Sequence, residues 1–325
     1  MNLSVRKISN LMQDSKPVFI VGAARSGTSI LYRTLQRHSR FYPQKCQSLP
    51  TVDLTESNIF KDPYSSYSLS YSSHQSALNY MLGTQEYYQK FLQQTSLLQK
   101  KQCFLLGKQA INKIIPLISL GRQSLWLATG NDLLVQVFFY YAQQARGMDR
   151  ILEKTPQHIY RLPEIKATFP KAKLIFMPRH PIDVYSSYRQ RLQKELELNT
   201  PDTDLKWLQI SPQSFCWRYA FCMHIAHQEK IKNQQRFFLI TYEDFTKHTE
   251  AKLREILDFL DEPYEEACLL EDESQKLHWQ ADPKLFESIQ NNKKKWQEFI
   301  SETEASWIEN KLAKTMQKLG YSRYT

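Results

Sequence analysis

The segment Pro17-Val-Phe-Ile-Val-Gly22 constrains the fold most, because it is a short apolar run that ends in glycine and leads at once into a polar loop. Such a run is typical of a parallel strand that helices cover on both faces. Ile30, Leu31, Thr34 and Leu35 then follow at helical spacing. The order of strand, loop and helix predicts an α/β unit near the start of the chain.

Later segments repeat this alternation. Apolar runs at 150–155, 173–177 and 236–241 predict three more strands. A helix is predicted at 157–169, and apolar residues within 253–260 recur at the i, i+3, i+4 and i+7 positions of an amphipathic helix. Strands that alternate with helices predict a three-layer α/β fold with a parallel central sheet.

The composition fits one folded domain over residues 1–325. Hydrophobic residues make up 42% and charged residues 23% of the chain, which allows a packed core and excludes general disorder. Residues 17–40 and 150–300 form the predicted core of this domain, and residues 41–149 form a largely helical insertion. The net charge of +10 fits an anionic partner, and composition alone leaves nucleic acid, an anionic membrane and a small polyanion open.

The chain also lacks several patterns that mark other classes of protein. Its 5 cysteines form no CxxC pair, so neither a zinc site nor a disulfide framework is indicated. The N-terminal segment has no apolar stretch of signal-peptide length, and no run of about 20 apolar residues occurs. We therefore expect a cytoplasmic protein without a transmembrane segment.

The loop after the first predicted strand has the features of a phosphate-binding loop. Gly22 and Gly27 have the spacing of the glycines in the nucleotide-binding motif GxxxxGK[ST], and Thr28 and Ser29 offer hydroxyl donors. Thr28 replaces the lysine that reaches the terminal phosphates of ATP, which argues against a P-loop nucleotide kinase and leaves it as an alternative. Arg25 supplies a cation inside the loop instead. The simpler interpretation is an ordinary turn between a strand and a helix.

A second anion-binding pattern follows the strand at 173–177. Arg179 comes directly after this strand, Ser187 lies about two turns into the next predicted helix, and Arg191 lies one turn further on the same face. An arginine fork, a hydroxyl and a second arginine together can bind a phosphate monoester. Taken alone, this segment is better explained as a solvated basic face of a helix.

Together the two patterns resemble the PAPS-dependent sulfotransferases, which use adenosine 3′-phosphate 5′-phosphosulfate as the sulfuryl donor. The family's RSGT[TS] and R-x-P-x-D-x-x-x-S motifs match Arg25–Ser29 and Arg179–Ser187. Three more elements match in order, and these are Glu153-Lys-Thr-Pro156 with Phe169-Pro-Lys-Ala-Lys173, Tyr242-Glu-Asp-Phe245 with the helix after it, and Lys294-Lys-Trp296. The first of them places the chain near the EKTP-containing branch of bacterial and tyrosylprotein-type enzymes.

The resemblance implies roles for individual residues. Arg25 and Lys154 would be the catalytic cations that stabilise the leaving oxygen and the sulfuryl oxygens, without a metal ion. The residues implied in donor binding are Arg25, Ser26, Gly27, Thr28 and Ser29 at the 5′-phosphosulfate, Arg179, Ser187 and Arg191 at the 3′-phosphate, and Tyr242 and Lys295 beside the nucleotide.

The chain departs from the families that it resembles at the position of the general base. The cytosolic branch has a catalytic histidine where this chain has Pro156, and the tyrosylprotein-type branch has a glutamate in a stretch that here contains no carboxylate. The next carboxylates are Asp53 and Glu56, of which we favour Glu56. The histidines His38, His74 and His158 are weaker candidates. Glu153 is expected to point away from Lys154, because successive side chains of a strand face opposite sides.

The acceptor implied by the resemblance is a small molecule, glycan, lipid or peptide that carries a hydroxyl or amine. Residues 41–148, where the resemblance is weakest, would shape its binding site. Nucleic acid is not an expected partner, because the chain has no basic-aromatic RNA motif or recognition-helix pattern. A second alternative is a protein of the same fold that binds PAPS or its product without turnover.

Overall fold

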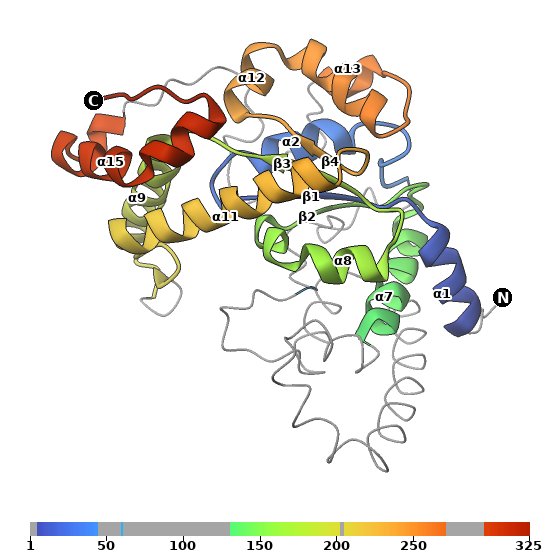
Figure 1. Cartoon of the computed structure of the whole chain (residues 1–325). Coiled ribbons are helices and arrows are strands. Elements are labelled where there is room, and N and C mark those ends of the chain that lie inside the picture. Colours follow the sequence, from blue (N-terminus) through green and yellow to red (C-terminus); the bar gives the residue numbers. More distant parts are fainter. Residues whose placement is uncertain (1–4, 45–59, 61–130, 202–204, 271–295) are drawn as a thin grey trace, which may run out of the picture.

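The structure is a computed structural model of the chain, and it describes residues 5–44, 60, 131–201, 205–270 and 296–325. Its centre is a parallel sheet of four strands in the order β2-β1-β3-β4. The strands are β1 (Val18–Gly22), β2 (Leu152–Lys154), β3 (Lys173–Met177) and β4 (Phe237–Leu239). Because all four run in one direction, the loops after them lie at one edge of the sheet, as Figure 1 shows.

Side chains of the central strand alternate between two hydrophobic cores. Phe19 and Val21 belong to one buried cluster, and Val18 and Ile20 belong to the other. All four are completely buried. This period of two on both faces means that helices cover both sides of the sheet, which confirms the predicted three-layer α/β fold.

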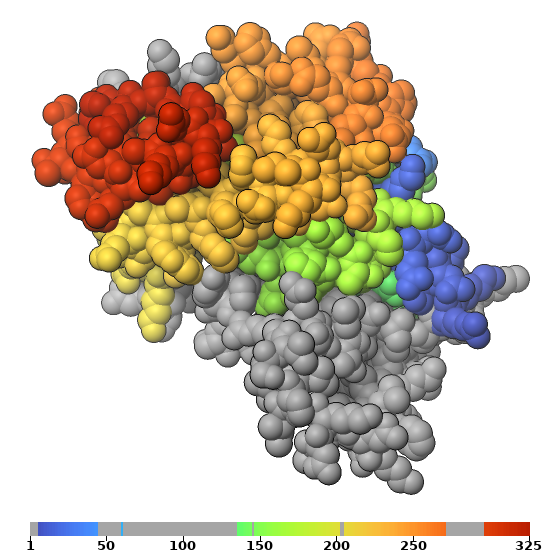
Figure 2. All heavy atoms as spheres, in the orientation of Figure 1, coloured from blue at the N-terminus to red at the C-terminus, as the bar shows by residue number. Residues whose placement is uncertain are grey.

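Helices from distant parts of the chain supply the two outer layers (Figure 1). One face is covered by α2 (Thr28–Gln36), α12 (Tyr242–Lys247) and α13 (Thr249–Phe259). The other cluster includes residues of α1 (Val5–Asp14), α7 (Asn131–Arg146), α8 (Leu162–Thr168), α9 (Pro181–Glu197), α11 (Pro212–Lys232) and α15 (Glu302–Leu319). The α1 and α15 ends of the chain lie on opposite sides of the molecule, as the blue and red atoms in Figure 2 show.

The predicted strands are confirmed, with shorter bounds for the second and fourth. The helix predicted at 157–169 differs, because the chain forms a 3₁₀ helix, η1 (Pro156–Arg161), and only then α8. Pro163 explains the break, since it has no N–H to donate to the carbonyl of Ile159 and its ring would crowd that carbonyl in a continuous α-helix. The proline instead occupies the first turn of α8, where a missing N–H costs nothing.

One expectation lies only partly within the described residues. Of the predicted insertion at 41–149, the structure describes α7 and a few residues beside it. Near the C-terminal end, the described chain forms a 3₁₀ turn, η4 (Trp296–Glu298), followed by α15. Among the described residues, no helix is both long enough and apolar enough to cross a membrane.

Candidate active site

The loop between β1 and α2 is a tight turn around two glycines. A Cβ on Gly22 would lie 3.0 Å from both Ser26 Oγ and Thr28 Cγ2, and the N–H of Ser26 donates to the carbonyl of Ala23 at 3.2 Å. Gly27 has a φ of 96° and is the N-cap of α2. Gly22 and Gly27 therefore allow a tight turn that leads directly into the first turn of α2.

This loop has the donors that a phosphate group needs. The first N–H groups of α2 have no carbonyl of their own helix to bind, and the helix dipole favours an anion at this end. Ser26 Oγ is buried and has no hydrogen-bond partner among the described residues. Thr28 is also buried, at the first position of α2. An anion with several acceptor oxygens is the group that satisfies such donors together.

The second loop, between β3 and α9, has the local structure that its sequence predicts. Pro181 begins α9, and the side chain of His180 caps the helix by accepting the N–H of Ile182 at 3.3 Å. Asp183 lies in the first turn, 3.8 Å from Arg179 Nη2. Arg179 is almost fully buried, and its Nε has no hydrogen-bond partner among the described residues. One nitrogen of this guanidinium is thus a buried donor that the described residues do not satisfy.

The two loops meet in space. Arg25 Nε donates a hydrogen bond to Ser187 Oγ at 3.2 Å, across a separation of 162 residues in the sequence. Because β1 and β3 are adjacent and parallel, their following loops lie next to each other. The structure therefore brings the two predicted motifs into one site, which neither motif predicts alone.

Tyr242 joins the same site from the loop after β4. A Cβ on Gly27 would lie 2.3 Å from Tyr242 Cδ2, so the tyrosine ring occupies the space beside that glycine. The guanidinium of Arg179 lies over the same ring, 4.2 Å from its centre. Burial raises the pKa of the Tyr242 hydroxyl. Tyr242 therefore contacts both loops as a neutral aromatic wall.

Lys154 lies at the end of β2, paired in register with Ile20 of β1, and it is buried. This position puts it at the same edge of the sheet as the Gly22 loop. The preceding Glu153 accepts a hydrogen bond from Thr155 Oγ1 at 2.5 Å, and its other oxygen lies 3.1 Å from His158 Nδ1. Glu153 thus belongs to a buried hydrogen-bond network, as expected for a structural carboxylate.

The remaining predicted site residues differ in what the structure says of them. Arg191 forms an ion pair with Glu195, one turn along α9, at 2.5 Å. Glu56 and Lys295 lie outside the described residues, as do Asp53 and His74. Trp296, the neighbour of Lys295, is buried in the larger hydrophobic core.

Two histidines considered as bases have structural partners. His158 is fully buried, and its second nitrogen accepts the N–H of Phe60 at 3.3 Å. His38 is also fully buried, with Nε2 2.9 Å from the carbonyl of Pro263. Both imidazoles are held within the fold, which gives neither one an open face for an acceptor hydroxyl.

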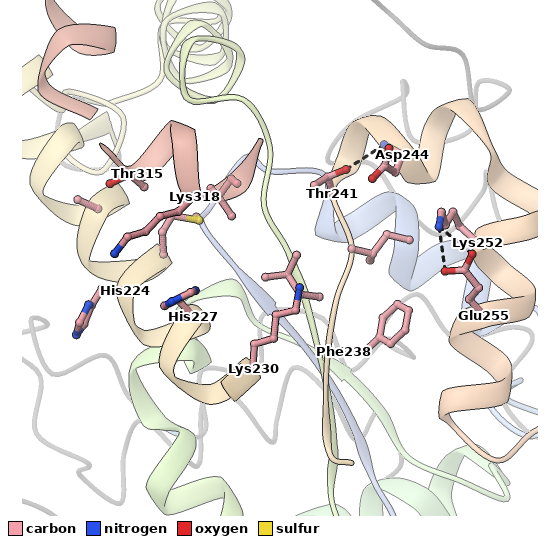
Figure 3. Close-up of a pocket in the computed structure, with 15 residues that line it drawn as sticks. His224, His227, Lys230, Phe238, Thr241, Asp244, Lys252, Glu255, Thr315 and Lys318 are labelled. Atoms are coloured by element: carbon pink, nitrogen blue, oxygen red, sulfur yellow. Dashed lines mark hydrogen bonds and ion pairs between the residues drawn. The ribbon is translucent and has the colours of Figure 1, made fainter. Parts of the chain in front are cut away.

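A separate cavity of about 490 Å³ opens beside β4 (Figure 3). Residues of α11, α13 and α15 line its sides, and these include Lys230 and Lys318. Thr241, directly before Tyr242, lies at its wall, but Arg25 and Arg179 are not among its lining residues. This cavity is therefore next to the two-loop site and does not contain it.

Within the described part of the chain, no group of three or more His, Cys, Asp or Glu side chains could hold a metal ion.

The structure thus has a parallel α/β sheet with two loops side by side at one edge, each carrying an arginine and hydroxyl side chains. Comparison with known families makes the assignment specific. The model of a sulfotransferase family matches residues 17–266, and the chain belongs to that family. The match includes every element of the two-loop site described above.

The chain is also similar to solved structures that are named as sulfotransferases. A sulfotransferase domain from the curacin biosynthetic pathway is 20% identical, with 95% of this chain and 99% of that chain covered and a TM-score of 0.47. Sulfotransferase STF9 from Mycobacterium avium is 14% identical, with 97% and 82% covered and a TM-score of 0.47. Retinol dehydratase, in a complex with retinol and PAP, is 13% identical, with 96% and 86% covered and a TM-score of 0.43. No curated protein matches the sequence.

Proposed function

We propose that this protein transfers a sulfuryl group from PAPS to a hydroxyl or amine of an acceptor. The bond between sulfur and the bridging oxygen of the donor phosphate breaks, and a bond from sulfur to the acceptor oxygen or nitrogen forms. The acceptor's proton goes to a general base, and adenosine 3′,5′-bisphosphate leaves with the electron pair of the broken bond. Such a reaction depends on positioning and on cations beside the developing charge.

The contact between Arg25 and Ser187 is the observation that carries this proposal. It joins a loop suited to one phosphate with a loop suited to another, and Tyr242 contacts both. A donor with phosphates at the 5′ and 3′ positions of one nucleoside matches two adjacent anion sites. The unpartnered Ser26 Oγ and Arg179 Nε are donors without acceptors among the described residues, which fits phosphate oxygens as their partners.

At the 5′ end, the backbone of Ser26 and Gly27 and the hydroxyls of Thr28 and Ser29 would bind the phosphosulfate. Arg25 would stabilise charge on the leaving oxygen. Lys154 would bind the sulfuryl oxygens from the end of β2, which lies beside β1. These two cations supply the charge stabilisation that a metal ion supplies in phosphoryl-transfer enzymes.

At the 3′ end, Arg179 and Ser187 would bind the phosphate, with Tyr242 as the wall of the nucleotide site. Arg191 would join them by exchanging its ion pair with Glu195 for the phosphate. Lys295 would approach the nucleotide from the C-terminal part of the chain.

Glu56 remains our proposal for the general base. Within the described residues, the site has cations and hydroxyls to bind the donor, and the carboxylate Glu153 is held by Thr155 and His158. A base within residues 41–149 would lie beside the acceptor, since the proposed acceptor site belongs to the same part of the sequence. Replacement of Glu56 by Gln tests this role directly.

The first experiment separates a sulfuryl-donor site from an ATP site. Full-length protein is titrated calorimetrically with adenosine 3′,5′-bisphosphate, AMP and ATP. We expect adenosine 3′,5′-bisphosphate to bind at least tenfold more tightly than the other two, because only it fills both loops. Preference for ATP would contradict the proposal and favour the P-loop kinase.

The second experiment separates turnover from binding alone. Radiolabelled PAPS is incubated with the protein and a panel of phenols, lipids, glycans and peptides, and the added SO₃ is detected by mass spectrometry. Arg25→Ala is expected to reduce the rate by about 100-fold, as loss of one transition-state donor does. Arg254→Ala is the control, because Arg254 forms an exposed pair with Glu250 on α13. Normal turnover by Arg25→Ala would contradict the assigned role.

A further inference from the structure

The residues after α15 fold back over the second anion-binding loop. Gly320 ends the helix with a φ of 74°, and the chain then turns toward the start of α9. The buried carboxylate of Glu309 anchors this segment by accepting the N–H of Tyr324 at 2.7 Å and that of Thr325 at 3.3 Å. We call residues 321–325 the C-terminal segment. Its end is marked C in Figure 1, at one side of the molecule.

The C-terminal segment contacts the loop around His180. The Tyr324 ring stacks on the imidazole, with ring centres 3.7 Å apart and an angle of 11° between the planes. Because His180 Nδ1 accepts the N–H of Ile182, the proton of the neutral ring is on Nε2, which donates to the carbonyl of Ser322 at 2.9 Å. Burial lowers the pKa of His180, which favours this neutral form.

A hydrogen bond from the segment reaches the carboxylate beside Arg179. The hydroxyl of Tyr324 donates to Asp183 Oδ2 at 3.2 Å, and the same oxygen lies 3.8 Å from Arg179 Nη2. A distance of 3.8 Å is too long for a direct hydrogen bond, so Asp183 attracts the guanidinium of Arg179 without being hydrogen-bonded to it. The tyrosine hydroxyl thus gives the Asp183 carboxylate a hydrogen-bond donor without adding a charge.

The segment is also tied to the loop that carries Tyr242. Glu243 accepts the N–H of His180 at 2.8 Å with one oxygen and the hydroxyl of Tyr321 at 3.0 Å with the other. One carboxylate therefore joins the start of α9, the start of α12 and the C-terminal segment. Arg179 and Tyr242 stack on each other between these anchored points.

We propose that the C-terminal segment is a positioning element that keeps Arg179 available for the 3′-phosphate of the donor, with Tyr324 as its main positioning residue. The proposal rests on the proposed function. Without the Tyr324 hydroxyl, Asp183 would close on Arg179 and compete with the phosphate for the guanidinium. Because Tyr324 is 44% exposed, its side chain contributes little to the core, and its hydrogen bond to Asp183 serves the loop.

The test measures how much the 3′-phosphate adds to binding. This quantity is the ratio of the dissociation constants for AMP and adenosine 3′,5′-bisphosphate, measured by calorimetry on the full chain. Tyr324→Phe keeps the stacked ring and removes the donor, and we expect it to lower the ratio about fivefold, as loss of one hydrogen bond of ordinary net strength does. Tyr324→Ala should lower it about tenfold, because the ring contact with His180 is lost as well.

The controls separate positioning from folding. Ser322→Ala leaves the ratio unchanged, because His180 binds only the backbone carbonyl of Ser322. A general loss of folding would weaken both nucleotides together and leave the ratio as it was, which counts against the proposal. A ratio that stays constant or rises in Tyr324→Phe overturns it. Equal binding of the two nucleotides by the wild-type protein overturns the proposed function as well.

Discussion

At the scale of single residues, the site depends on a position without a side chain. Gly27 adopts a φ of 96°, and the Tyr242 ring fills the space where its Cβ would be. The same ring carries the guanidinium of Arg179 on its face. The absence of one methyl group therefore determines where the aromatic wall and the second-loop arginine lie.

We expect Gly27→Ala to lower the free energy of unfolding by about 3 kcal/mol, from the left-handed backbone and from overpacking against Tyr242. Gly320→Ala is the matched control, because Gly320 has a φ of 74° but nothing within 4 Å of the added Cβ. It should cost only about 1 kcal/mol for the backbone alone. Urea unfolding of both variants measures the difference. Equal losses of unfolding free energy would show that overpacking against Tyr242 does not destabilise the fold.

At the scale of elements, the start of α9 combines a structural role with a proposed role in ligand binding. His180 caps the helix through its neutral imidazole and binds Ser322 with its other nitrogen. Burial is the main cause of its lowered pKa, while the nearby carboxylates Asp183, Glu243 and Glu309 raise it in part. Protonation of Nδ1 would replace an acceptor by a donor and break the cap.

This shift predicts a pH dependence of stability. A histidine whose folded pKa lies below its unfolded value of 6.5 contributes stability above pH 6.5, and that contribution is lost as the pH falls below it. His180→Asn keeps a capping oxygen that does not titrate. Urea unfolding at pH 7.5, 6.5 and 5.5 should therefore show a smaller loss of stability in the variant than in the wild type. Parallel pH profiles would contradict this assignment.

At the scale of the whole molecule, one buried arginine joins segments from both ends of the fold. Arg150 donates to the carbonyls of Lys16 and Leu260, each at 2.6 Å, and forms an ion pair with Glu262 at 2.8 Å. These contacts connect the entry to β1, the approach to β2 and the end of α13. Burial lowers the pKa of Arg150, and Glu262 opposes this shift.

Arg150→Met should lower the free energy of unfolding by about 3 kcal/mol, because it leaves two carbonyls without this donor and removes the shorter of the two ion pairs of Glu262, whose other partner is Arg40. Lys171→Met, which removes an exposed ion pair with Asp14, should cost less than about 0.5 kcal/mol. Chemical denaturation of the two variants compares them directly. A similarly small loss of unfolding free energy in both variants would mean that the contacts of Arg150 do not stabilise the fold.

The sequence by itself determined the parts of this protein that depend on neighbouring residues. The apolar runs before Gly22 and Arg179, the proline at the start of α9 and the glycine turn before α2 are local patterns, and the structure has the predicted strands and helices there. The break at Pro163 was within reach of the sequence as well, because this proline lies in the interior of the helix predicted at 157–169, where it disrupts a continuous α-helix.

Only the tertiary structure decided which of these parts meet. Arg25 binds Ser187 because β1 and β3 are neighbours in the sheet, and the order of strands is not written in any local pattern. Tyr324 reaches Asp183 across 141 residues, from a segment with no helical or strand periodicity of its own. Contacts of this kind arise from packing of distant elements, so the sequence predicted the two loops but not the C-terminal segment that contacts one of them.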